Sequence, residues 1–528
     1  MTDWPPGWAS APLREICAIN PRVDKNSIDT ESVVSFVPMP AVEAGTGKID
    51  VSETRSFGAV RKGYTPFRKG DILFAKITPC MENGKMAVVP DLVSEHGFGS
   101  TEFHVLRPAD GVDQRFIYRA VSNRAFRFHA EHNMTGAVGQ KRVPATILEE
   151  HQIGLPPTNE QRRIADRIET LFDEIDRGVA SLRAAKGNID LYRQSLLKSA
   201  FEGRLTADWR AENREKLESP DALLARISEE RESSHKRGLD DWQKAVDKWR
   251  KGGEKGRKPA RPRRAAHFEV KTKAPTDVAT STPRHWLWLS LFELGQVTGG
   301  LTKNPSRNAL PRKAKYLRVA NVYSNRLALD EIMEIGLTED ELRKTRLSTG
   351  DLLFVEGNGS IEQIGRVAIW DGSVPSVTHQ NHLIRFSTNG LLSSRFALYF
   401  MMSPIGRKLV TAQASSTSGL HTLSITKVGS LPIPICSPAE QAEIIGTLDD
   451  RLEAAEALDA EIEASLARAE ALRQAILKKA FSGELVPQDP DDEPAQALLA
   501  RIRASRDGDA TTKPRTRARR PASATVPR

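Results

Sequence analysis

Two stretches of the chain carry apolar residues at alternating intervals of three and four positions. The first stretch runs through Ile164, Ile168 and Leu171, and the second runs through Ile444 and Leu448. This spacing places the apolar side chains on one narrow stripe of an α-helix, while charged residues fill the remaining faces. The pattern therefore predicts two long helices that each bury a seam against a partner helix.

Polar residues mark where the two predicted helices begin. The sequence Ser437-Pro438-Ala439-Glu440 offers a serine cap, a proline at the first helical position and a glutamate at the third. Thr158 can cap the first helix, with Gln161 reaching back. Helices of about 40 residues, at about 1.5 Å per residue, are rods roughly 60 Å long, so we expect spacer helices over 158–205 and 437–486.

The two helical stretches are copies of one another. Residues 160–205 reappear without a gap as residues 440–485, an offset of 280 residues. The matched pairs include Glu160/Glu440, Gln161/Gln441, Arg193/Arg473, Lys198/Lys478, Phe201/Phe481 and Gly203/Gly483. The same offset relates Gly70-Asp71 to Gly350-Asp351, each of which precedes an apolar run. A self-similarity at this spacing indicates two halves of similar build rather than a stacked array of short repeats.

Short apolar runs and amphipathic stretches alternate in the segments that precede the helices. Runs that read as strands lie at 72–75, 86–89, 352–355 and 367–370, and stretches that read as helices lie at 116–128 and 394–402. We expect an α+β fold with two α/β domains that are related by a pseudo-two-fold axis. The two long helices separate these domains and form an antiparallel coiled coil, since both copies lie in one chain. The alternative is that the helices pair with another chain.

The pattern divides the chain into six segments. These are two globular domains at 1–157 and 281–436, two spacer helices at 158–205 and 437–486, a basic, charged helical insert or linker at 206–280, and a basic tail at 487–528 that we expect to be disordered. With 528 residues, 39% of them hydrophobic, the chain is long enough to bury two separate cores.

The positive charge of the chain is concentrated in two places. The net charge is +9 and the isoelectric point is about 9.3. Lysines and arginines cluster at 248–264 and at 513–520. Such clusters are typical of proteins that meet a polyanion. The plainer interpretation, which the Pro, Gly and Lys content favours, is a solubilising linker and tail with at most an auxiliary contact to phosphates.

Neither a membrane nor an oxidising compartment is indicated. No apolar run approaches the roughly 18 to 20 residues that span a bilayer, and the first residues lack a charged-then-apolar signal. Cys17, Cys80 and Cys436 lie far apart and form neither a disulfide framework nor a C-x-x-C metal pair. We therefore expect a cytoplasmic protein with reduced thiols.

The two domains share a skeleton but differ in their loops. Residues 76–85 and 356–363 follow equivalent predicted strands, yet their sequences differ, which suggests two different ligands of one class. Both loops are rich in the side chains that read base edges. The DNA-binding candidates are Lys76, Thr78, Asn83, Lys85, Thr135, Gln140, Lys141 and Arg142 in the first domain, and Asn358, Ser360, Gln363, Arg366, Thr378, His379, Gln380, Asn381, Ser418, His421 and Thr422 in the second.

Motifs of nucleotide and methyl-transfer chemistry are absent from the sequence. The chain has no G-x-x-x-x-G-K-[ST] loop, no Asn-Pro-Pro-aromatic tetrapeptide and no glycine-rich strand-to-helix fingerprint. His379 and His382 lack accompanying metal ligands, so hydrogen bonding is favoured over zinc binding. A nuclease site that includes Asp71 is disfavoured, because Asp71 recurs as Asp351 in a turn before a strand. We predict no catalytic residue and no metal site.

Each domain is followed by a long helix that opens with a motif such as residues 155–161 (LPPTNEQ) and closes with one such as residues 193–205 (RQSLLKSAFEGRL). In this order of domains and helices, and in its doubled closing motif, almost the whole chain resembles the DNA specificity subunits of type I restriction-modification systems. The resemblance implies that each domain is a target recognition domain that reads one half of a split DNA sequence. It also implies that the helices hold the two halves a fixed number of base pairs apart.

The resemblance further implies partner subunits and their cofactors. Two methyltransferase subunits would clamp onto the helices and domains and supply S-adenosylmethionine, and a restriction subunit that uses ATP and Mg can join them, so this chain would bind no cofactor. The helical frame and its partner contacts would include Arg193, Lys198, Phe201, Arg473, Lys478 and Phe481. The long basic insert at 206–280 departs from the pattern. Two alternatives stay open: a self-contained DNA-modifying or DNA-cleaving enzyme, and a coiled-coil scaffold that binds polyanions without sequence preference.

Overall fold

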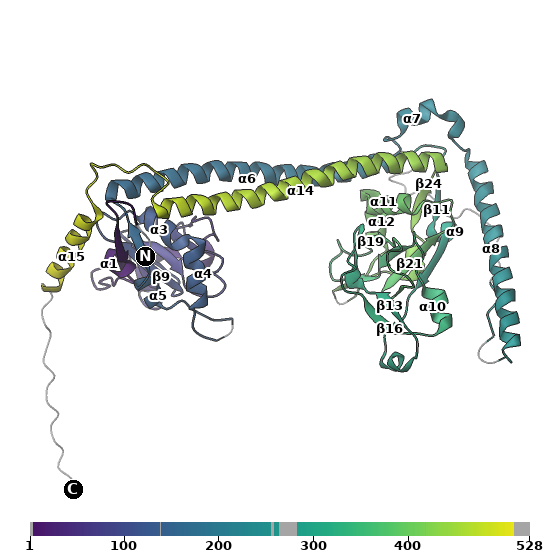
Figure 1. Cartoon of the computed structure of the whole chain (residues 1–528), viewed down its shortest axis with the longest axis horizontal. Coiled ribbons are helices and arrows are strands. Elements are labelled where there is room, and N and C mark those ends of the chain that lie inside the picture. The colour runs from purple at the N-terminus through teal and green to yellow at the C-terminus, as the bar shows by residue number, and fades with distance from the viewer. Residues whose placement is uncertain (1–3, 138, 255–257, 263–281, 418, 512–528) are drawn as a thin grey trace, which may run out of the picture. The chain divides into compact units, whose positions relative to one another are not determined.

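The computed structural model describes residues 4–137, 139–254, 258–262, 282–417 and 419–511 (Figure 1). Its contacts divide the chain into two compact units, Met1–Arg183 with Ile462–Arg528, and Ala184–Glu461. Each unit holds one globular domain together with parts of both long helices. The units therefore cut across the segments expected from sequence, because each long helix begins in one unit and ends in the other.

The two predicted spacer helices are present as α6, Thr158–Phe201, and α14, Pro438–Ser482. Ser437 caps α14 as predicted, because its hydroxyl accepts a 3.3 Å hydrogen bond from a backbone N–H three residues on. The predicted cap of α6 is wrong. Thr158 is already helical, and its hydroxyl donates to the carbonyl oxygen of Gly111 at 2.9 Å.

The two long helices pair with each other in opposite directions. In the first unit, Arg473 of α14 forms an ion pair with Asp176 of α6. In the second unit, Arg193 of α6 lies 3.6 Å from Asp459 of α14. Residue numbers rise along α6 as they fall along α14, which confirms an antiparallel coiled coil formed within this chain.

The first domain contains two four-stranded sheets. One has the strand order β2-β9-β6-β7 with antiparallel neighbours, and the other has the order β4-β3-β8-β5, in which β3 and β8 are parallel. Helices α3, Gln114–Ser122, and α4, Arg124–His132, follow the first sheet. The strands are β2 (Cys17–Ile19), β3 (Val33–Val37), β4 (Thr54–Ser56), β5 (Thr65–Arg68), β6 (Ile72–Ala75), β7 (Met86–Val88), β8 (His96–Gly99) and β9 (Phe103–Pro108).

The second domain repeats the first sheet in the order β12-β21-β17-β19. Its other sheets have the orders β16-β13-β20 and β18-β23-β22. Helices α11, Ser394–Met402, and α12, Pro404–Gln413, follow as in the first domain. The strands are β12 (Gly295–Gly299), β13 (Lys313–Leu317), β16 (Met333–Gly336), β17 (Leu352–Val355), β18 (Gly357–Asn358), β19 (Val367–Ile369), β20 (Thr378–His379), β21 (Leu383–Thr388), β22 (Ser415–Thr417) and β23 (Leu420–Thr422).

Short elements complete both domains. A two-stranded antiparallel ribbon leads into each long helix, β1 with β10 in the first domain and β11 with β24 in the second. The remaining elements are β1 (Ala9–Pro12), α1 (Leu13–Ile16), α2 (Phe57–Val60), α5 (Ala145–Glu149), β10 (Gln152–Leu155), α7 (Ala207–Glu212), β11 (Leu287–Ser290), α9 (Leu291–Leu294), β14 (Val322–Tyr323), β15 (Arg326–Leu327), α10 (Glu339–Thr345), α13 (Ile425–Gly429) and β24 (Pro432–Ile435). The predicted α+β class is confirmed.

The repeated Gly-Asp pair is a structural turn. Gly70 and Gly350 both have positive φ, +80° and +94°, which favours glycine. The following Asp71 accepts a 2.8 Å hydrogen bond from the backbone N–H of Arg68, and Arg107 donates to both of its carboxylate oxygens at 2.7 Å. Asp71 is therefore buried in an ion pair that orders the turn before β6.

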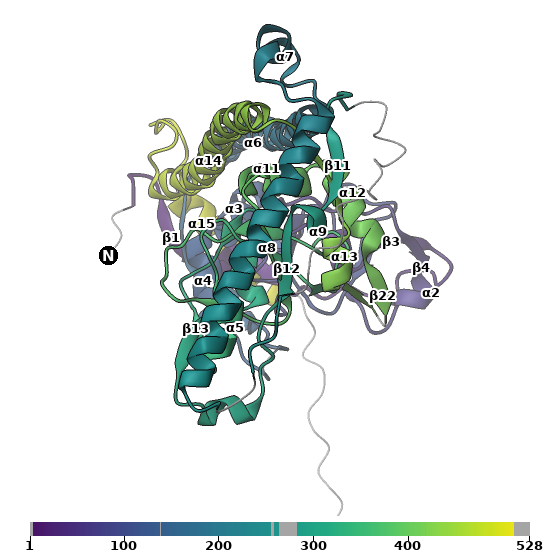
Figure 2. The same cartoon turned by 90° about the vertical axis from the view of Figure 1, so that its right-hand side faces the viewer.

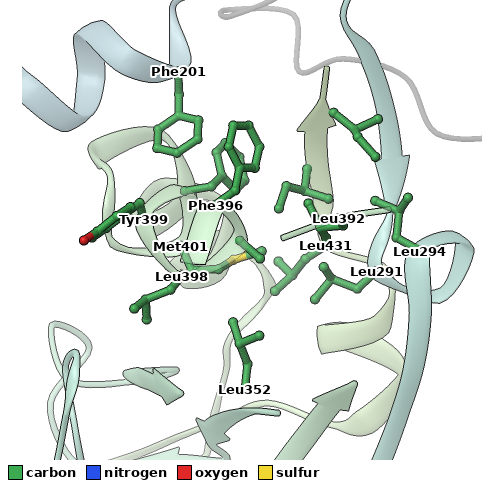
Figure 3. Close-up of a cluster of buried hydrophobic side chains, with 14 of the residues drawn as sticks. Phe201, Leu291, Leu294, Leu352, Leu392, Phe396, Leu398, Tyr399, Met401 and Leu431 are labelled. Atoms are coloured by element: carbon green, nitrogen blue, oxygen red, sulfur yellow. The ribbon is translucent and has the colours of Figure 1, made fainter. Parts of the chain in front are cut away.

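Each long helix ends against the domain that it does not follow in sequence. Phe201, at the end of α6, is fully buried and packs edge-on against Phe396 and Phe400 of the second domain, each at 5.2 Å between ring centroids (Figure 3). Phe481, near the end of α14, packs 5.4 Å from Phe116 of the first domain. The closing motifs are anchors, since their aromatic side chains complete the cores of these domains.

The segments after the long helices extend this exchange. Helix α8, Pro220–Lys251, runs along the side of the second domain that carries α9 and β12 (Figure 2), and buries Leu223 and Ile227 there. Helix α15, Ala495–Thr511, buries Leu498 and Ile502 in the first domain. The expectation of a disordered tail from residue 487 is therefore wrong for α15, whose apolar side chains have a core to enter. The basic cluster at 513–520 lies outside the described residues.

Candidate nucleic-acid interface

In the first domain, two loops that are distant in sequence lie side by side. The loop after β6, residues 76–85, is joined to residues 135–142 by backbone hydrogen bonds. The N–H of Thr78 donates to the carbonyl of Lys141 at 3.0 Å, and the N–H of Val143 donates to that of Lys76 at 2.8 Å. The fold thus brings together the two loops that carry all eight candidates that the sequence suggested for this domain.

The eight side chains differ in how freely they can meet a ligand. Asn83, Thr135, Gln140 and Lys141 are exposed, whereas Lys76, Thr78, Lys85 and Arg142 are half-buried. Three of the half-buried residues hold the loops together. Thr78 donates to Glu82 (2.6 Å), Lys85 donates to the carbonyl of Met39 (3.2 Å), and Arg142 donates to both oxygens of Glu102 (2.9 and 2.8 Å).

The ion pair between Arg142 and Glu102 fixes the border of this surface. Hydrogen bonds from Arg142 outweigh the effect of burial and keep the pKa of Glu102 below its usual value. The same carboxylate raises the pKa of the Arg142 guanidinium through hydrogen bonding. Both groups remain charged at neutral pH, so a base that approaches Arg142 would compete with Glu102 for its donors. The exposed amides and Lys141 are the better placed readers.

The second domain brings its loops together by the same backbone pairings. The backbone of Ile77 pairs with that of Arg142 in the first domain, and the backbone of Gly357 pairs with that of Thr422 in the second. Ile77 and Gly357 are 280 residues apart, and so are Arg142 and Thr422. Thr135 likewise matches Ser415, which pairs with Thr422. The N–H of Leu423 donates to the carbonyl of Glu356 at 2.8 Å, as Val143 does to Lys76. The backbone frame of the two surfaces is thus the same.

The side chains on that shared frame are different. Lys76, Lys141 and Arg142 correspond to Glu356, His421 and Thr422. In the second domain Ser360 and Gln363 are exposed, and Asn358, Arg366, Gln380, Asn381, His421 and Thr422 are half-buried. Ser418 lies outside the described residues. The first surface is the more basic of the two, so the same backbone positions present different chemistry.

Two of the predicted DNA-binding residues are interior. Thr378 and His379 are fully buried. The Thr378 hydroxyl lies 2.6 Å from that of Thr345, and His379 Nδ1 lies 3.1 Å from the Thr345 carbonyl oxygen. Burial lowers the pKa of His379 to about 3, so its imidazole is neutral. DNA cannot reach these side chains, and we remove both from the candidate interface.

The structure also adds residues that the sequence reasoning missed. Tyr323 and Arg326 are two of them: the ring centroid of the half-exposed Tyr323 lies 5.1 Å from the guanidinium of the predicted candidate Arg366 and 4.6 Å from that of Arg326. Arg127 and Arg407 donate to backbone carbonyls of the two loops. Arg127 and Arg407 are also related by the offset of 280. A comparison of the helices that precede residues 135–142 and 415–422 could therefore have identified both arginines from sequence.

Neither a cluster of metal ligands nor a membrane-spanning helix is found among the described residues. Among these residues, no three His, Cys, Asp or Glu side chains gather as metal ligands would. His382 lies 2.8 Å from Glu356, a contact that stays within the candidate surface. No helix in the described part of the chain is long and apolar enough to cross a membrane.

Comparison with known proteins finds similar sequences. A model of the type I restriction modification DNA specificity domain matches residues 5–180. The type I restriction enzyme EcoEI specificity subunit of Escherichia coli is 35% identical over 212 residues, which are 39% of this chain and 35% of that protein, so the match spans about a third of the relative's length. The type I restriction enzyme EcoKI specificity subunit of Escherichia coli strain K12 is 24% identical over 523 residues, 95% of this chain and 96% of that protein.

A solved structure shares the fold. It is described as the structural basis underlying complex assembly and conformational transition of the type I R-M system, and one of its chains matches with a TM-score of 0.62. The match covers 92% of this chain and 100% of the other at 18% sequence identity. The likeness therefore extends to both domains and both long helices.

Proposed function

This chain belongs to the DNA specificity subunits of type I restriction-modification systems, and we propose that it binds a bipartite, gapped DNA sequence and directs the other subunits of such a complex to that sequence. Each domain reads one half of the target through the loops gathered on its surface. The paired helices α6 and α14 set the distance between the halves.

The observation that carries this proposal is the shared backbone frame of two unlike loop surfaces. The pairings Ile77 with Arg142 and Gly357 with Thr422 place equivalent residues at equivalent positions. The paired positions carry Arg142 in one domain and Thr422 in the other, and the residues just before them are Lys141 and His421. Base contacts specify a sequence, whereas contacts to phosphates position a protein on DNA. One frame with two sets of side chains suits two half-sites of different sequence.

The proposal includes partner subunits and a location. Two methyltransferase subunits would supply S-adenosylmethionine and modify adenine, and a restriction subunit that uses ATP and Mg would cleave unmodified DNA. This chain would hold no cofactor and carry no catalytic residue. The complex would work in the cytoplasm, where its DNA substrate lies.

The experiment that tests the proposal is a map of methylated adenines in the genome of the source cell, with and without this gene. We expect deletion of the gene to abolish methylation at one gapped, two-part motif, and a plasmid copy to restore it. An unchanged map, together with binding of the assembled complex to DNA without sequence preference, would reject the proposal in favour of a non-specific scaffold.

A further inference from the structure

One arginine in each domain holds the backbone of the loop that follows the central strand. Arg127, in α4, donates from Nη1 to the carbonyl oxygen of Glu82 at 3.2 Å. Arg407, in α12, donates from Nη2 to the carbonyl oxygen of Glu362 at 3.0 Å. The donors are 280 residues apart, and so are the acceptors. The contact is therefore made twice, although residues 76–85 and 356–365 differ in sequence.

The acceptor in both contacts is a main-chain group. A bond to a carbonyl oxygen fixes the path of the loop without engaging any loop side chain. The residue after each held carbonyl is an exposed amide, Asn83 in the first domain and Gln363 in the second. Asparagine and glutamine are the side chains that pair bidentately with adenine in the major groove. Each arginine thus holds the backbone next to a free reader.

Both arginines stand on helices that are packed into their domains. Phe126, beside Arg127, is buried and lies 6.0 Å from the ring of Phe74 in β6. Ile405 and Val410, on either side of Arg407, are buried in the core of the second domain. A guanidinium on a packed helix can hold a loop in one place, because its own position is set by the core.

The contact of Arg127 lies in a partly buried setting, whereas that of Arg407 is exposed. Burial of part of its side chain still lowers the pKa of Arg407, but an arginine keeps its charge in proteins. A charged donor in a partly buried setting makes a stronger hydrogen bond than a neutral donor in water. In the first domain, Gly84 leaves room for this arrangement, because a Cβ at that position would lie 2.9 Å from Arg127 Nη1.

We propose that Arg127 and Arg407 are positioning residues for sequence reading, each of which sets the direction of the neighbouring amide side chain, Asn83 or Gln363, and so governs the specificity for one half of the target. The inference rests on the proposed function, since it takes the two loop surfaces as the readers of two half-sites. Neither arginine needs to touch DNA for this role.

The test measures discrimination by the assembled methyltransferase complex. Three DNA duplexes are compared: the target found by methylation mapping, and two versions with one base pair changed in one half or the other. We expect Arg127→Ala to lower the ratio of binding to the intact and altered duplexes about tenfold for one half-site only. Arg407→Ala should do the same for the other half-site, so each variant is the control for the other.

Further variants separate positioning from a general loss of structure. Arg127→Lys should restore part of the discrimination, because an ammonium group can also donate to the Glu82 carbonyl. Arg124→Ala, on an exposed residue of the same helix, should behave as wild type. If Arg127 acts through Asn83, the double variant Arg127→Ala with Asn83→Ala should lose no more discrimination than Asn83→Ala alone.

The outcomes distinguish this inference from the proposed function. Wild-type discrimination in both half-sites by Arg127→Ala and Arg407→Ala would overturn the inference and leave the proposed function standing. Equal losses in both half-sites from either single variant would also overturn it, because the arginine would then act on the whole protein. A wild-type complex that binds all three duplexes equally would instead reject the proposed function.

Discussion

The indole Nε1 of Trp286 donates a 3.0 Å hydrogen bond to the carboxylate of Glu440, at the start of α14. Glu440 is fully buried, and Arg210 donates to the same carboxylate at 2.8 Å. The first unit has the equivalent bond, in which Trp8 donates to Glu160, also at 3.0 Å. Among the hydrogen bonds described for Glu160, none comes from an arginine that would correspond to Arg210. The start of each long helix is thus tied to its own domain by a buried carboxylate.

We expect Glu440→Gln to destabilise the second unit by about 3 kcal/mol, because it removes the buried carboxylate that pairs with the half-buried guanidinium of Arg210. The matched variant Glu160→Gln should cost less. Hydrogen exchange at residues 437–441 and 206–210, read by mass spectrometry, would report the change locally, since a chain of two units need not unfold in one step. Equal effects of both variants would contradict the role assigned to Arg210.

The two carboxylates should respond to acid in opposite directions. Burial raises the pKa of Glu440, but hydrogen bonds from His285, Arg210 and Trp286 outweigh it, and the folded-state pKa lies below the usual value. Its contribution to stability is therefore present above the unfolded-state pKa, about 4.3, and is lost as pH falls through the lower folded-state value. Burial raises the pKa of Glu160 overall, so this group costs stability at neutral pH and the cost is relieved as pH falls.

We predict from these signs that the second unit loses protection before the first as the pH is lowered from 6 to 3. Hydrogen exchange at the starts of α6 and α14 would follow the two units separately. Glu440→Gln should flatten the pH dependence of the second unit and leave that of the first unchanged. An earlier loss at the start of α6 would show that other carboxylates dominate.

Phe201→Ala should destabilise the second unit by about 3 to 5 kcal/mol, because it removes a fully buried aromatic ring that contacts Phe396 and Phe400. Calorimetry of the variant and of Leu472→Ala, whose side chain is 52% exposed, would compare the two on one scale. The control should change stability by less than about 0.5 kcal/mol. A small effect of Phe201→Ala would mean that the end of α6 is not anchored in this core.

Adding seven residues to each long helix where the units divide, after Arg183 and after Glu461, should lengthen the gap in the recognised sequence. Seven helical residues add about 10 Å, which is roughly three base pairs of DNA. Both half-sites should stay the same, since the insertions leave the contacts inside each unit in place. Methylation mapping of cells that carry the variant would read the new gap, and an unchanged gap would contradict the role of the helices as spacers.

The repeated features of the chain were the ones that sequence could reveal. Heptad-like spacing from Ile164 and from Ile444 predicted α6 and α14, and the shared offset predicted two domains of one build. In the first domain, the apolar runs identify the strands on both sides of residues 76–85, but only the structure shows that residues 135–142 lie beside that loop. That the side chains of these two segments contact DNA remains a prediction.

What sequence could not reveal depends on distant partners. Thr378 and His379 sit in a polar run that looks like a loop, but these two residues form β20, which pairs with β13 and is contacted by Thr345, so their side chains are interior. The same holds for α15, whose apolar residues needed the first domain to explain them. Local pattern carries no information about which domain a helix end will meet.

The exchange of helix ends between domains has a consequence for chain order. Gly203 and Gly483, both with positive φ, pack against Pro283 and Pro5, so the start of each domain rests on the end of a long helix in the same way. The residues of the first junction are 80 positions apart, and those of the second lie near opposite ends of the sequence, 478 positions apart. A permuted protein in which residues 282–511 precede residues 4–262 would make the same contacts in both units, so connectivity and architecture are separable here.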